Sequence, residues 1–166
     1  PMQPQACENI VFATLYTGQG EVAARTAQDC MQMKNKRDRA APYIALFEYF
    51  GWRVANKEAQ AKAALANEAL TELQLQLNRG QWPLPVVKYL RGEITGEELL
   101  KQTSNNDEQT EARAYLGYDL SLRGKKDDAV PHLRWVKEYG NRNFVEHPLA
   151  VLELHRIEEA KAKGNK

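Results

Sequence analysis

The chain has 166 residues, a length typical of one domain of roughly 100–200 residues. Apolar residues make up 43% of it and charged residues 27%, which is enough to form a core and a water-exposed surface. The formal net charge of +1 gives no strong overall field, so it argues against a nucleic-acid-binding module and against attraction to an anionic membrane.

The first half of the chain predicts two helical hairpins. Residues that favour helices dominate, and no long alternation of β-branched residues predicts a strand. The first hairpin covers about 6–33 and turns at Gly18-Gln19-Gly20, because glycine readily takes the backbone angles of a tight turn. The second covers about 42–77, and its second helix carries an apolar stripe with a spacing of four residues: Ala61, Leu65, Ala69, Leu73 and Leu77.

The second half predicts two more hairpins and a final helix. The third hairpin covers about 82–102; its first helix opens at Trp82-Pro83-Leu84-Pro85, and Thr95 and Glu98 have the spacing of a capping box for its second helix. The fourth covers about 108–139 and turns at Gly124. A last helix follows over about 146–162. In all we predict about nine helices, with boundaries good to a few residues.

The fourth hairpin has the pattern of a tetratricopeptide repeat, a helix–turn–helix unit of about 34 residues. Gly117 lies in the middle of the first helix, where a small residue lets the partner helix approach, and Ala129, Leu133 and Val136 face inward from the second helix. The first two hairpins match more weakly. We therefore predict an all-α fold, an α-α superhelix of stacked hairpins forming one domain over 1–166. A generic helical bundle is the alternative.

Such a stack predicts a concave surface that binds proteins. Each hairpin needs a neighbour to bury its apolar face, and the first helices of successive hairpins then line a groove that accepts a peptide or helix. In the competing interpretation, aromatic residues at helical spacing belong to the core. The residues predicted to line the groove are Tyr43, Leu46, Phe50, Arg53, Glu111, Tyr118 and Ser121.

The two cysteines of the chain, Cys7 and Cys30, lie nearly symmetrically about the first turn. In an antiparallel hairpin such positions face each other, and helix axes about 8–10 Å apart allow the Cα separation that a disulfide needs. We hypothesise a disulfide, which would suit an exported protein. The alternative is two small buried residues in a reducing compartment.

We expect neither a catalytic nor a metal site, and no cofactor. His132, His147 and His155 do not have the spacing of metal ligands, and the chain has no CxxC motif. It also has no GxSxG nucleophile motif and no glycine-rich phosphate loop. Trp82 and Trp135 are assigned to the packing of hairpins.

Three segments resemble a known family: 82–100 (WPLPVVKYLRGEITGEELL), 114–124 (AYLGYDLSLRG) and 143–154 (NFVEHPLAVLEL). Through them, the region from about 41 to 154 is similar to the tetratricopeptide lipoproteins of bacterial envelopes typified by new lipoprotein I. The resemblance implies a helical repeat fold, homodimerisation and an adaptor role among envelope proteins. It implies no catalytic residues.

These observations favour a non-enzymatic scaffold that binds a protein or peptide partner. We expect it to be periplasmic or exported, with a cytoplasmic location as the alternative. We expect no direct insertion into a membrane, because no apolar run approaches the ~20 residues that span a bilayer. The competing function is a regulatory or oligomerisation module of a larger enzyme.

Overall fold

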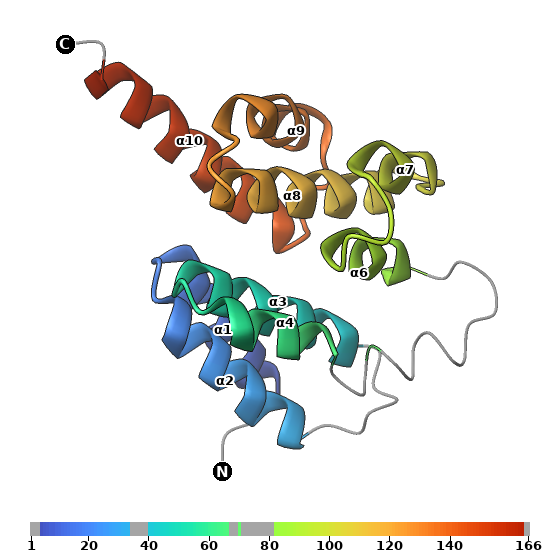
Figure 1. Cartoon of the computed structure of the whole chain (residues 1–166), viewed down its shortest axis with the longest axis vertical. Helices are drawn as coiled ribbons and strands as arrows, with labels where there is room; N and C mark the ends of the chain where they lie inside the picture. The colour runs from blue at the N-terminus through green and yellow to red at the C-terminus, as the bar shows by residue number, and fades with distance from the viewer. Residues whose placement is uncertain (1–3, 34–39, 67–69, 71–81, 165–166) are drawn as a thin grey trace. The chain divides into compact units, whose positions relative to one another are not determined.

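A computed structural model describes residues 4–33, 40–66, 70 and 82–164 of the chain (Figure 1). These residues form nine helices and no strand, so the predicted all-α class is confirmed for this part of the chain. The chain divides into two compact units, Pro1–Glu93 and Ile94–Lys166, where the sequence was interpreted as one domain. The predicted third hairpin, 82–102, is divided between the two units.

The first unit contains five of these helices: α1 (Pro4–Tyr16), α2 (Gly20–Met33), α3 (Ala41–Val54), α4 (Glu58–Leu65) and α6 (Leu84–Leu90). Each of α1 to α4 packs against the next, which gives the first two predicted hairpins (Figure 1). Of the predicted apolar stripe, Ala61 and Leu65 are buried. Ala69, Leu73 and Leu77 lie outside the described residues, as does the segment 34–39.

The first hairpin turns where the sequence predicts, since Gly18 has a φ of +76°, an angle that residues with a side chain rarely adopt. A disulfide joins Cys7 of α1 to Cys30 of α2, with their Cα atoms 5.8 Å apart. This is the pairing hypothesised from the symmetry of the two positions about the turn. Both residues are fully enclosed, with at most 1% of their surface exposed.

Helices α2 and α3 approach closely because each has a glycine at their contact. A Cβ atom on Gly20 would lie 2.5 Å from the carbonyl oxygen of Gly51, and one on Gly51 would lie 2.7 Å from the backbone nitrogen of Ala24. Since α3 also contacts α1 and α4, it is enclosed on most of its circumference. The Phe47 ring of α3 meets the Phe12 ring of α1 edge to face, with centroids 4.5 Å apart.

The second unit contains α7 (Gly96–Lys101), α8 (Asn106–Leu122), α9 (Lys126–Tyr139) and α10 (Glu146–Gly164). The predicted capping box is present: the Thr95 hydroxyl accepts from the Glu98 backbone N–H, and the Glu98 carboxylate accepts from the Thr95 backbone N–H. Asn105 caps α8 by accepting from the Glu108 N–H at 2.9 Å.

Helices α8, α9 and α10 pack against one another and form the core of the second unit (Figure 1). Gly117 lies against Leu133, as the repeat pattern predicts. Gly124, at the turn between α8 and α9, has a φ of +79°. The buried residues of this core are Ala114, Ala129, Leu133, Val136, Ala150, Leu154 and Ile157.

Candidate functional site

Most of the residues predicted to line a groove are buried. Leu46 and Phe50 have no exposed surface, and Glu111, Tyr118 and Ser121 expose at most 7% of theirs. The expectation that these five side chains offer an accessible binding surface is therefore wrong. Its physical reason is that α3 contacts α1, α2 and α4, while α8 contacts α7, α9 and α10, so few faces of either helix remain uncovered.

The remaining two predicted residues, Tyr43 and Arg53, are partly exposed. Arg53 is held by its neighbours: Nη1 donates to the Tyr49 hydroxyl at 3.0 Å, and Nε lies 3.1 Å from the Glu58 carboxylate. Its guanidinium therefore fastens the start of α4 to the end of α3. The structure does not bring the predicted residues together as one accessible site.

Two of the buried residues serve the packing of α10 on α8. The Ser121 hydroxyl donates to the Glu153 carboxylate of α10. Burial, together with the charge of Glu153, raises the pKa of the Tyr118 phenol well above its usual range, so this phenol stays neutral. The polar character that suggested recognition of a partner is thus used inside the unit.

A different group of aromatic and basic side chains is exposed or partly exposed at the surface of the second unit. It consists of Arg113 of α8 and His132, Trp135 and Tyr139 of α9, and we call it the aromatic patch. The Trp135 and Tyr139 ring centroids are 5.9 Å apart, and the Arg113 guanidinium lies 4.9 Å from the Trp135 ring centroid. Tyr139 is 63% exposed, the most exposed large hydrophobic residue among the described residues.

Hydrogen bonds fix the arginine of this patch. Arg113 Nε donates to the Gln109 side-chain oxygen at 3.0 Å, and Nη1 lies 3.3 Å from His132 Nδ1. Arginine is always a donor, so His132 must accept at this nitrogen. Burial, with the Arg113 charge, lowers the pKa of His132 and keeps the ring neutral at physiological pH. Arg113 is therefore the positive charge of the patch.

The sequence contained a weak signal for this patch. His132, Trp135 and Tyr139 follow one another at helical spacings of three and four, which places them on one face of α9. The assignment of Trp135 to hairpin packing is correct in part, since this ring also packs against the core of the second unit. The sequence alone does not predict that Arg113, which belongs to α8, lies against this face of α9.

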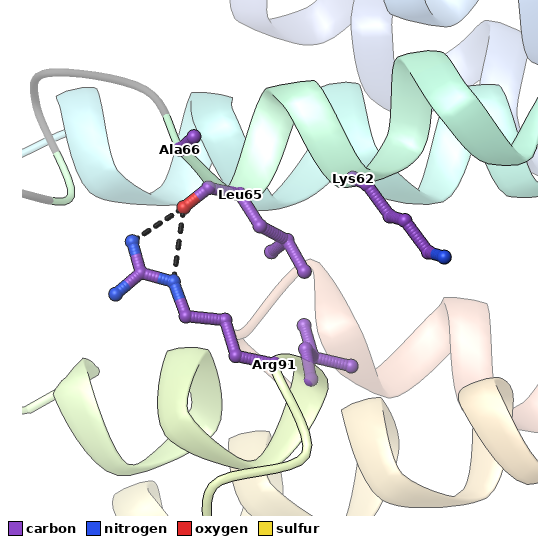
Figure 2. Close-up of a pocket in the computed structure, with 5 residues that line it drawn as sticks. Lys62, Leu65, Ala66 and Arg91 are labelled. Atoms are coloured by element: carbon purple, nitrogen blue, oxygen red, sulfur yellow. Dashed lines mark hydrogen bonds between the residues drawn. The ribbon is translucent and has the colours of Figure 1, made fainter.

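The first unit has a pocket of about 410 Å³ between α4 and α6 (Figure 2). Arg91, the residue that follows α6, donates from its guanidinium to the carbonyl oxygen of Leu65 at the end of α4, with Nε at 3.1 Å. This bond satisfies a carbonyl that has no partner within the helix. The pocket is lined by Lys62, Leu65, Ala66, Leu90 and Arg91.

The described side chains of the aromatic patch and of the pocket are aromatic, aliphatic or basic. Among these described side chains there is no carboxylate pair and no nucleophile with a neighbouring base. Within the described ranges, no cluster of three or more His, Cys, Asp or Glu side chains has the geometry to hold a metal ion. Among the helices of the described residues, none combines the length and apolar character needed to cross a bilayer.

No protein-family model matches the chain, and no solved structure matches it significantly.

Proposed function

We propose that this protein is a non-enzymatic interaction scaffold, a helical repeat of the tetratricopeptide type that binds a partner protein through the aromatic patch. The observation that carries the proposal is the surface cluster of Tyr139, Trp135 and Arg113, in which a tyrosine that is 63% exposed lies beside a partly exposed tryptophan and arginine. Tyrosine, tryptophan and arginine are the residue types that contribute most to binding energy at protein interfaces.

The patch is also prepared for binding before a partner arrives. Trp135 is held by the core of the second unit, and Arg113 is held by Gln109, His132 and the Trp135 ring. Because these side chains are already ordered, a partner would lose less conformational entropy on contact than with mobile side chains. The guanidinium supplies a positive charge beside two apolar rings, which suits a partner that presents an apolar side chain next to a carboxylate.

The disulfide bears on where such a scaffold works. Disulfides persist in oxidising compartments and are rare in the cytosol. The Cys7–Cys30 bridge therefore supports an exported or periplasmic protein, the compartment that the family resemblance implies.

The test is photo-crosslinking in the native host, with a benzophenone amino acid in place of Tyr139, followed by measurement of the affinity for the captured protein. We expect Tyr139→Glu to abolish this binding, because it puts a charge into the apolar contact. The matched control is Val22→Glu, which changes an exposed apolar residue of the first unit that is 48% exposed.

Circular dichroism would establish that both variants fold. If the Tyr139→Glu protein binds the captured partner as tightly as the wild type does, the aromatic patch is not the binding surface. If no partner is captured from position 139 but one is captured when the benzophenone amino acid replaces Val22, the scaffold binds through the first unit instead.

A further inference from the structure

We propose that the pocket between α4 and α6 binds a carboxylate carried by an aliphatic group, with the aliphatic part between Leu65 and Leu90 and the carboxylate at Lys62. Figure 2 shows how the lining residues lie. The Leu65 side chain points from α4 towards α6, the Lys62 amine lies to one side of it, and the Arg91 guanidinium lies to the other. An apolar centre with positive charge at its rim is thus built from two helices.

Lys62 is the charge available to a ligand. Its neighbour one turn earlier on α4, Glu58, is 3.1 Å from Arg53 and belongs to that ion pair. Among the described residues, the Lys62 ammonium makes no ion pair and no side-chain hydrogen bond. An ammonium group without an intramolecular partner binds an added carboxylate without having to break an existing contact.

Arg91 has a different role in the same pocket. Two of its guanidinium nitrogens donate to the Leu65 carbonyl oxygen, and its Nη1 is 3.9 Å from the Glu93 carboxylate. These contacts hold α6 to the end of α4 and so fix the distance between the two leucine walls. We therefore assign Arg91 to the construction of the pocket, and Lys62 to recognition of the ligand.

The lining limits the class of ligand. A volume of about 410 Å³ lies at the small end of the range of about 300–1,000 Å³ for small-molecule sites. Among the described residues of the lining there is no aromatic ring on which a base or sugar could stack, and no side-chain carboxylate or amide to bind hydroxyl groups. Two leucines and an alanine beside one unpaired ammonium fit an aliphatic acid. This chemistry has two sources: a free fatty acid, or the C-terminus of a peptide that ends in a leucine-sized residue.

The experiment uses the full chain and follows its backbone amides by NMR during titration with two probes. Octanoate stands for the free acid and N-acetyl-leucine for the peptide C-terminus. Octanamide and N-acetyl-leucinamide are the neutral controls, since they keep the aliphatic part and lose the charge. We expect saturable shifts in 58–66 and 84–91 with an acid and weak or no binding of its amide.

Lys62→Gln supplies the matching change in the protein, because it removes the charge and keeps most of the side chain. We expect it to weaken binding of the acid by about tenfold, the loss typical of one charge-assisted contact. Lys163→Gln, on the exposed end of α10, is the control and should leave the affinity unchanged. Preference for octanoate identifies a free acid as the ligand, and preference for N-acetyl-leucine identifies a peptide terminus.

Two results would overturn the proposal. One is the absence of saturable shifts in these helices with either acid at millimolar concentration. The other is equal binding of acid and amide that Lys62→Gln does not weaken, which would mean that the lysine has no part in recognition.

Discussion

Replacing Gly117 with alanine tests the close contact between α8 and α9. A Cβ atom at this position would lie 2.7 Å from Cδ2 and 2.8 Å from Cγ of Leu133. Favourable contacts between carbon atoms need about 3.5–4.0 Å. Leu133 is fully buried, and in a close-packed interior it can move only by displacing its neighbours. The substitution must therefore displace α9, rotate Leu133 out of its preferred rotamer, or do both.

The magnitude follows from two opposing terms. Overpacking of a buried contact costs about 1–3 kcal/mol, while alanine in place of glycine within a helix gains about 1 kcal/mol. We expect Gly117→Ala to lower the free energy of unfolding by up to about 2 kcal/mol, the difference between these terms. Leucine at the same position, with three more carbon atoms to accommodate, should cost more.

A double-mutant cycle separates the two terms. Leu133→Ala removes the atoms with which the new Cβ would collide, at a cost of about 2–5 kcal/mol for the cavity. In that background the helix-propensity term alone remains, so Gly117→Ala should raise stability by up to about 1 kcal/mol. The effect of the same substitution thus changes sign with the residue at 133.

The assay is equilibrium unfolding in urea, followed by far-ultraviolet circular dichroism of all four proteins. A loss of stability from Gly117→Ala that is the same with leucine and with alanine at 133 would refute the reasoning. It would mean that Gly117 matters for the backbone of α8 rather than for its contact with Leu133.

Two further substitutions test the buried polar and covalent contacts. Burial raises the pKa of Glu146, whose carboxyl group accepts a hydrogen bond from the Tyr115 hydroxyl at 2.6 Å. The folded state therefore binds this proton more tightly than the unfolded state does. The stability that the bound proton contributes is lost as the pH rises through the raised pKa. Glu146→Gln, which stays neutral, should therefore be more stable than the wild type at pH 7. Urea titrations at several pH values should show this difference in stability shrinking towards pH 4, and a difference that does not change with pH would contradict the prediction. Removing the disulfide by the double replacement Cys7→Ala and Cys30→Ala should cost about 3 kcal/mol, because the two cysteines are 23 positions apart in sequence and the bridge closes a loop of that length. Calorimetry of the oxidised and substituted proteins measures this, and detection of two free thiols in the oxidised native protein would show that the bridge does not form.

Local features of the fold could be predicted from the sequence because they depend on a few neighbouring residues. Gly18 and Gly124 terminate helices at the turns where the sequence places them, and both adopt positive φ angles. Thr95 and Glu98 form the expected capping box. In each case the physical cause lies within four residues of its effect, so the spacing along the chain contains the necessary information.

Which helix faces are exposed could not be predicted in the same way, because the exposure of a helix depends on how many other helices pack around it. The spacing of Leu46 and Phe50 correctly places them near one face of a helix, but the same spacing is found on a covered face. The aromatic patch needs Arg113 to reach Trp135 across two helices. The pocket needs Arg91 to reach Leu65, which lies 26 positions earlier in the sequence. Neither pairing has a signal in local periodicity.

The polar residues of α8 show why a binding surface should be sought at the edge of the α8–α9 pair. Tyr115 donates to Glu146 of α10, Ser121 donates to Glu153 of α10, and the fully buried Asp119 pairs with Arg123 at 2.8 Å. A partner that bound the face of α8 covered by α10 would have to break the two hydrogen bonds to α10, and each buried group left without its partner would cost about 1–3 kcal/mol. Binding at the aromatic patch would break no such buried hydrogen bond, because Tyr139 is already exposed and Arg113 is already held beside Trp135. A partner that gains contact there keeps the packing of α10 intact, which is the physical reason to place recognition at the patch.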